Sequence, residues 1–171
     1  MVNADIIIKS YNDWDFGLFK ACYINYMNEL ALIMQEPITV DPDDYIDWLV
    51  HFEEANIYML YKDSVQCGFL ITGFGINCCD GCDLFIMEFY IVPEFRKQGL
   101  GTAAMKNFIS AHPGRYCLKI HKYNDAAQSF WTNLQKAICS TDISDKITDP
   151  RPNENFELKA FETQGYKYPK A

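Results

Sequence analysis

The sequence predicts a mixed α/β fold of about seven strands and four helices, in the order βααβββαβαββ. Short apolar runs rich in β-branched and aromatic residues predict the strands, and apolar residues at three- and four-residue spacing predict the helices. Three consecutive strands with no helix between them favour an antiparallel start to the sheet. With 171 residues, 49% of them apolar, the chain is predicted to form one domain over residues 1–171 with a substantial core.

Local signals place each element along the chain. Three consecutive isoleucines predict the first strand, and Asp41 followed by Pro42 is a typical helix start. Asp80-Gly81 is a dipeptide that favours a hairpin turn. The predicted strands are Asp5–Ser10, Ile57–Lys62, Gln66–Gly75, Leu84–Val92, Arg115–His121, Ala137–Ser144 and Asn155–Glu162, and the predicted helices begin near Trp14, Asp41, Gly99 and Asn124.

Charge and composition exclude several classes of protein. The net charge of −8 argues against general binding to nucleic acid. No apolar run approaches the ~20 residues of a membrane span, so we expect no membrane partner. The N-terminus lacks a signal-peptide pattern, and seven cysteines without one favour reduced thiols in the cytoplasm.

The strand Leu84–Val92 and the turn after it predict an anion site. Pro93 ends the strand, and a basic turn with two glycines leads into a helix. Glycines let the backbone approach a ligand closely, and the first N–H groups of a helix favour a phosphate. A GxG pair alone is a weak signal, because many such pairs are only tight strand-to-helix turns.

The fuller pattern around this turn is more specific. Arg96-Lys97-Gln98-Gly99-Leu100-Gly101 follows a strand that ends in Ile91-Val92-Pro93. It lacks the third glycine of a dinucleotide-binding fingerprint, since Ala104 stands there, and it lacks the GK[ST] of a P-loop. This segment resembles the coenzyme-A pyrophosphate loop of the GCN5-related N-acetyltransferase (GNAT) superfamily. Residues 124–131, NDAAQSFW, are similar to the family's second motif.

The resemblance implies a GNAT-type fold, with a central, mostly antiparallel, twisted sheet of about seven strands flanked by about four helices. It also implies an acyltransferase that moves an acetyl group from acetyl-CoA to a primary amine by direct attack in a ternary complex. Backbone N–H groups of the turn would hold the pyrophosphate, and the backbone of the preceding strand would pair with the pantetheine arm. The cofactor-binding residues implied are Ile91, Val92, Arg96, Lys97, Gln98, Gly99, Leu100, Gly101, Thr102, Asn124 and Trp131.

Glu88 is the candidate general base. A carboxylate on an apolar strand needs a reason, because burying it unpaired costs several kcal/mol. Alternation places it on the face of Ile86 and Tyr90, and some GNAT relatives carry a catalytic acidic residue at the matching position. Burial would raise its pKa toward the range of a working base. The other interpretation is a structural carboxylate that bonds nearby backbone or only orients the acceptor.

The proton donor for the leaving thiolate is less clear. The family often has a tyrosine where this chain has Trp131, and an indole is no practical acid. Tyr123 is the nearest replacement, with Tyr90 and Cys117 behind it, although Tyr123 also suits simple packing. Solvent protonation of the thiolate is the other route. Asn124 resembles the asparagine that bonds the cofactor arm, and it also suits a helix cap.

Cys78-Cys79-Asp80-Gly81-Cys82 has one CxxC spacing, from Cys79 to Cys82. A structural zinc needs four ligands, and no second CxxC or paired histidines accompany this one. We therefore expect a hairpin with small apolar thiols and no metal.

The sequence leaves the acceptor, the acyl chain length and the oligomeric state open, a homodimer included. Acidic residues between Asp41 and Glu54 are either a solvated helix face or a feature that favours a cationic amine. Two other functions remain: a non-catalytic acyl-CoA-binding or regulatory domain, and an unrelated nucleotide-binding α/β protein.

Overall fold

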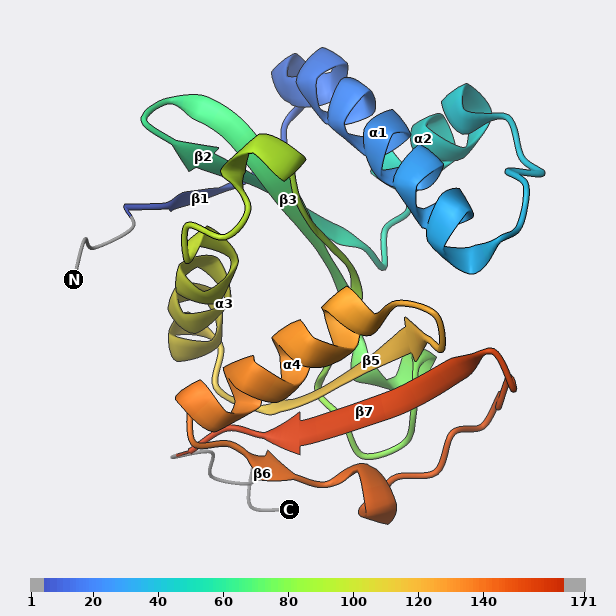
Figure 1. Cartoon of the computed structure of the whole chain (residues 1–171), viewed down its shortest axis with the longest axis vertical. Helices are drawn as coiled ribbons and strands as arrows, with labels where there is room; N and C mark the ends of the chain where they lie inside the picture. The colour runs from blue at the N-terminus through green and yellow to red at the C-terminus, as the bar shows by residue number, and fades with distance from the viewer. Residues whose placement is uncertain (1–4, 165–171) are drawn as a thin grey trace. The chain divides into compact units, whose positions relative to one another are not determined.

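The computed structural model describes residues 5–164 and confirms the predicted mixed α/β class (Figure 1). Its strands form one sheet in the order β1-β2-β3-β4-β5-β7-β6. The pairs β1–β2, β2–β3, β5–β7 and β6–β7 are antiparallel, and β4 pairs with β5 in parallel. The strands are β1 (Ile7–Ser10), β2 (Asn56–Lys62), β3 (Val65–Phe74), β4 (Leu84–Ile91), β5 (Arg115–His121), β6 (Thr141–Asp142) and β7 (Phe156–Glu162). The helices are α1 (Phe16–Met34), α2 (Pro42–Val50), α3 (Leu100–Ala111) and α4 (Asp125–Ala137).

One predicted element is much shorter than expected. The strand predicted at Ala137–Ser144 is reduced to β6, because α4 continues through Ala137. The N–H of Ile138 still donates to Leu134, and Cys139 then adopts a positive φ of 52° that turns the chain. A short apolar run directly after a helix therefore resembles a strand in the sequence, even where its backbone still belongs to the end of the helix.

The described chain divides into two compact units, and each is considered by itself. The first comprises the residues up to Thr72 together with Met87–Met105, and the second comprises Gly73–Ile86 together with the residues from Lys106 onward. The expectation of one domain over residues 1–171 stays a prediction. None of the helices in residues 5–164 combines the length and the apolar character that crossing a membrane requires.

In the first unit, two apolar clusters use different side chains of the same strands. Phe19 and Tyr23 of α1 pack with Phe69 of β3 and Tyr90 of β4, together with side chains of α2. The other cluster joins the start of α3 to side chains that include Phe89 and Ile91 of β4. Strand alternation places Glu88 on the face of Tyr90, toward the cluster that includes α1. The first cluster contains Phe19, Cys22, Tyr23, Ile46, Leu49, Ile57, Met59, Phe69, Ile71 and Tyr90.

In the second unit, β5 and β7 pair over their full lengths, from Arg115 opposite Glu162 to His121 opposite Phe156. The rings of Tyr116 and Phe161 stack at 5.3 Å across this pair. A separate apolar cluster is rich in sulfur and holds Cys78, Cys79, Cys117, Ile143 and Ala160.

Candidate active site

Glu88 lies on β4 and faces α1, where the hydroxyl of Tyr26 donates a hydrogen bond to its Oε2. Burial of the carboxyl group raises the pKa of Glu88 to about 8, although the residue as a whole keeps some exposed surface. Donation from Tyr26 opposes this shift, because a hydrogen bond to the carboxylate favours its charged form. Glu88 is thus a carboxyl group that changes charge near neutral pH.

Aromatic rings explain why the surroundings of Glu88 solvate its charge poorly. The ring of Tyr26 lies 5.4 Å from those of Tyr23 and Tyr90 and 5.5 Å from that of Phe69. Tyr23 is buried, and its pKa is raised first by burial and then by the negative charge of Glu88. Ring edges and faces offer much weaker solvation than water, so the carboxylate is costly there.

A second carboxylate on α1 holds Arg96. Both oxygens of Glu29 accept hydrogen bonds from the guanidinium at 2.7 Å, which lowers the pKa of Glu29. The Nε of Arg96 also donates to the carbonyl of Ile91 at 2.7 Å, and the guanidinium lies 5.2 Å from the ring centre of Tyr90. Burial and the charge of Glu29 raise the pKa of Tyr90 to about 12. Arg96 therefore ties α1 to the end of β4.

The predicted anion loop has the expected form. Pro93–Phe95 make one turn of 3-10 helix, Lys97 and Gly99 take positive φ of 59° and 77°, and α3 begins at Leu100. Residues 96–99 are exposed. The first N–H groups of α3 have no partner within their own helix, as in any α-helix. An exposed loop thus leads into the N-terminus of α3, whose first N–H groups suit a phosphate.

Three backbone groups of the segment predicted to pair with the pantetheine arm already make internal hydrogen bonds. The N–H of Val92 donates to the carbonyl of Cys67 at 2.9 Å, and its carbonyl accepts from Phe95 at 2.9 Å. The carbonyl of Ile91 accepts from Arg96. Each of these carbonyls keeps a second lone pair for a ligand, whereas the N–H of Val92 does not serve two partners well.

The remaining predicted residues lie in the second unit. Asn124 caps α4 by accepting from the N–H of Ala127 at 3.1 Å, which confirms its capping role. Trp131 is buried and its ring lies 5.1 Å from that of Phe130. Tyr123 is half exposed, with its ring 5.2 Å from that of His121. Cys117, the last acid candidate, is buried in the sulfur-rich cluster.

Sequence reasoning missed the two α1 residues that contact the predicted site. Tyr26 and Glu29 follow Tyr23 at three-residue steps, so all three lie near one face of the helix. This three-residue spacing is the signal in the sequence for a polar face on α1, and the apolar residues of the helix do not reveal it. The polar groups of this face are the partners of Glu88 and Arg96.

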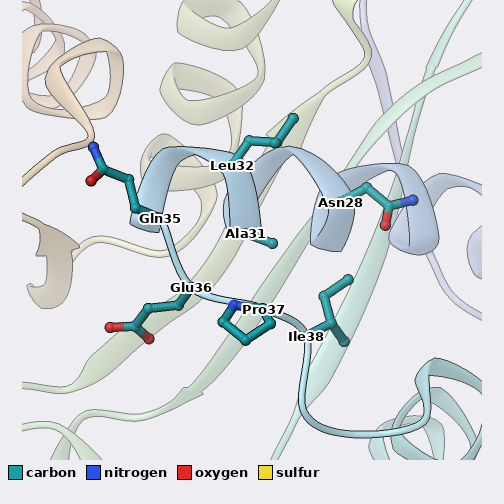
Figure 2. Close-up of a pocket in the computed structure, with 7 residues that line it drawn as sticks. All are labelled: Asn28, Ala31, Leu32, Gln35, Glu36, Pro37 and Ile38. Carbon is teal, nitrogen blue, oxygen red and sulfur yellow. The ribbon is translucent and has the colours of Figure 1, made fainter.

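The first unit also has an open hollow at the C-terminal end of α1, of about 610 Å³. Figure 2 shows Leu32 on the helix with Pro37 and Ile38 on the segment that follows it. The hollow contains none of the predicted site residues, and its lining lies largely on the helix face opposite Tyr26. It is lined by Asn28, Ala31, Leu32, Gln35, Glu36, Pro37 and Ile38.

Comparison with known proteins assigns the family. A family model described as "Acetyltransferase (GNAT) family" matches residues 23–135, which is well over half of the chain. The chain belongs to the GNAT acetyltransferase family. The match includes the strand with Glu88, the anion loop and the second motif of this GNAT protein. No curated protein sequence matches the chain.

Solved structures show the same fold at low identity. An acetyltransferase from Thermus thermophilus has a TM-score of 0.67 at 14% identity, covering 94% of this GNAT chain and 97% of its own. Diaminobutyrate acetyltransferase EctA from Paenibacillus lautus, with L-2,4-diaminobutyric acid and coenzyme A, has 0.63 at 10%, covering 97% and 99%. YncA from Salmonella typhimurium, with acetyl-CoA, has 0.57 at 15%, covering 99% of both chains.

Proposed function

We propose that the protein is an N-acetyltransferase that transfers the acetyl group of acetyl-CoA to a primary amine. The observation that carries this proposal is Glu88, a carboxyl group on β4 with its pKa raised to about 8. A base is most effective when its pKa lies near the working pH.

Acetyl-CoA is the co-substrate that the family and the fold support. EctA and YncA, which share the fold, were solved with coenzyme A and acetyl-CoA respectively. The loop from Lys97 to Thr102 offers the backbone donors that a pyrophosphate requires. Because Arg96 pairs with Glu29, we expect its side chain to fix the loop on α1, and the backbone groups and Lys97 to contact the phosphates.

The reaction we propose is direct attack within a ternary complex. An amine is protonated at neutral pH, so it must lose a proton before its nitrogen can attack the thioester carbon. Glu88 in its carboxylate form takes this proton, and Tyr26 positions the carboxylate through its hydroxyl. The new C–N bond forms, the C–S bond breaks, the thiolate of coenzyme A leaves, and the nitrogen releases its second proton to solvent to give the amide. Tyr123 and solvent stay the two proposals for the proton that this thiolate then receives.

Cationic amines are the acceptors to test first. Acidic residues mark the start of α2, and Asp43 among them already pairs with Lys20 at 2.9 Å. The acceptor of the EctA complex, L-2,4-diaminobutyric acid, is a diamine. Attraction of a second ammonium group by these carboxylates would favour diamines and polyamines over simple amines.

The test is incubation of the protein with acetyl-CoA and a panel of amines, with product detection by mass spectrometry. The panel covers diamines, polyamines, aminoglycosides, amino acids and peptide N-termini. The proposal predicts an acetylated amine formed in proportion to the coenzyme A released. Stabilisation of the protein by acetyl-CoA without any product would favour the non-catalytic acyl-CoA-binding alternative. A protein stabilised by ATP or NAD and not by acetyl-CoA would contradict both.

A further inference from the structure

Four cysteine thiols gather in the second unit, and none of them is used in the proposed reaction. The Sγ atoms of Cys78, Cys79 and Cys117 all lie within 4.8 Å of one another. The side chain of Cys82 lies beside those of Cys117 and Cys79. All four are free thiols. Three are fully buried, whereas Cys82 is only partly buried and so leaves a way in from solvent.

The backbone around these thiols is built to bring them together. Parallel pairing of β4 and β5 sets Cys117 opposite Phe85, beside the β3–β4 connection. The N–H groups of Cys78 and Cys79 both donate to the carbonyl of Gly75 at 2.9 Å, which closes a tight turn. The thiol of Cys117 lies 3.7 Å from the same carbonyl.

Glycines and an arginine hold the remainder of this connection in place. Gly75 packs so closely that a Cβ there would lie 2.1 Å from the carbonyl oxygen of Cys82. Gly81 has a φ of 86°, which turns the chain back between Cys79 and Cys82. The N–H of Asp83 donates to the carbonyl of Arg115 at 2.8 Å, and the Asp83 carboxylate accepts from the Arg115 N–H at 2.8 Å.

We propose that Cys78, Cys79, Cys82 and Cys117 form a tetrahedral thiolate site for Zn²⁺. Zinc in structural sites takes four such ligands, and with bonds of about 2.3 Å its neighbouring sulfurs stand roughly 3.8 Å apart. The spacing of the three buried thiols is compatible with this arrangement after a small inward movement. Sulfur as the sole donor type selects zinc or another thiophilic ion over magnesium or calcium.

The charges near the thiols suit a site with four thiolates and one divalent ion, which would carry a net charge of −2. The positive charge of Lys119 lies near Cys78 and that of Arg115 lies near Cys82. The carboxylate of Asp83 places an opposing negative charge near Cys82. The cations have partners of their own, Asp149 for Lys119 and Glu162 for Arg115. The metal would fix the β3–β4 connection to β5, which is a structural role.

This inference reverses the expectation drawn from the sequence. Cys79 and Cys82 alone supply too few ligands for structural zinc. The missing ligands are the adjacent Cys78 and the distant Cys117, and only the fold brings Cys117 to the loop. The CxxC spacing in the sequence therefore shows only two of the four proposed ligands.

The direct test uses the full chain, purified under reducing and metal-free conditions and titrated with Zn²⁺ against a chromophoric chelator. The proposal predicts one tightly bound Zn²⁺ per chain. Cobalt(II) in its place should give the intense visible bands and the sulfur-to-metal charge transfer of tetrahedral thiolate coordination. Binding of less than one equivalent, or a weak octahedral cobalt spectrum, would overturn the proposal.

Serine variants separate the site from general thiol chemistry. Cys82→Ser, at a partly buried position, should weaken zinc binding by more than about 100-fold, since loss of even an outer-shell partner typically costs 10–100-fold. Cys117→Ser should do the same if circular dichroism shows it folded. Cys139→Ser is the matched control, because Cys139 is an exposed thiol outside the cluster. Equal zinc affinity in Cys82→Ser and the control would contradict the site.

Discussion

The proposed role of Glu88 as a base depends on the side chains that surround its carboxyl group. Its carboxyl group accepts a hydrogen bond from the hydroxyl of Tyr26, whose ring lies among those of Tyr23, Phe69 and Tyr90. Glu29, which follows Tyr26 by one turn of α1, is in the opposite situation, because Arg96 holds it with two hydrogen bonds. The two carboxylates therefore have pKa values displaced in opposite directions, raised for Glu88 and lowered for Glu29.

The raised pKa makes Glu88 a source of instability at high pH. Between its usual value of 4.5 and about 8, the folded protein binds a proton at Glu88 that the unfolded chain has released. Stability is therefore lost as the pH rises through this range. Glu88→Gln carries no charge, so at pH 8 its free energy of unfolding should exceed that of the wild type by on the order of 2 kcal/mol, after allowance for the partial exposure of Glu88. The check is the difference in melting temperature between the two proteins, which should grow from pH 4.5 to 8. A difference that is constant with pH would mean that Glu88 titrates normally.

Tyr26→Phe should change the titration of Glu88 without removing the base. Loss of the hydroxyl removes a hydrogen bond to the carboxylate, worth roughly 1 kcal/mol, so the pKa of Glu88 should rise by roughly 0.5–1. The measurement is the pH dependence of kcat/KM, whose midpoint should move upward.

Tyr61→Phe is the matched control for this variant. The hydroxyl of Tyr61 donates to Asp15 at 3.2 Å instead of to Glu88, so the midpoint should stay at the wild-type value. Equal profiles for Tyr26→Phe and the control would remove Tyr26 from the positioning of Glu88.

At the scale of elements, the close approach of β3 to β4 positions the site. Gly68 of β3 lies against the backbone of Tyr90, and the register of β2 with β3 shifts beside it, between Leu60 and Tyr61. The N–H of Val92 then donates to Cys67. This contact fixes the end of β4, the strand that carries Glu88 and leads into the anion loop.

Gly68→Ala should destabilise the protein strongly. A Cβ at this position would lie 2.1 Å from the carbonyl oxygen of Tyr90, so the backbone of one strand must move. We expect a loss of about 3 kcal/mol in the free energy of unfolding, measured by urea denaturation. Gly17→Ala in α1 is the matched control, because its Cβ would meet nothing within 4 Å. That variant should be stabilised by about 0.5–1 kcal/mol. Equal stability of the two variants would show that β3 and β4 are not closely packed at Gly68.

The sequence predicted local structure well and distant pairing poorly. The loop at Lys97 and Gly99, the cap at Asn124 and the face of Glu88 all follow from residues a few positions apart, and such signals are local. The contacts of Glu88 with Tyr26 and of Arg96 with Glu29 join residues 62 and 67 positions apart. Periodicity shows which face a residue occupies but not which element lies opposite.

At the scale of the whole molecule, the central question is which ligand stabilises the folded chain. The family match spans residues 23–135, and the fold neighbours cover almost the full chain. A ligand that binds only the folded state raises its stability in proportion to the logarithm of its concentration over Kd. Acetyl-CoA should therefore act on the melting transition of the whole protein.

We expect acetyl-CoA at about 100 times its Kd to add about 2.7 kcal/mol, which is roughly 5–10 °C for a chain of this size. Scanning calorimetry should show this shift in one cooperative transition, as the single-domain prediction requires. ATP and NAD at the same concentration are the controls and should leave the transition in place. Two separate transitions, only one of them moved by acetyl-CoA, would contradict the single domain and leave the cofactor assignment standing.

The most direct test of Glu88 as the base is the turnover of Glu88→Gln with an amine that the wild type acetylates. We expect a kcat lower by about 10²–10⁴-fold, the contribution typical of a general base, with an unchanged Kd for acetyl-CoA. Glu154→Gln, at an exposed position of the second unit, should keep the wild-type rate. Equal acetylation by Glu88→Gln and the wild type across the pH range would show that Glu88 is not the base.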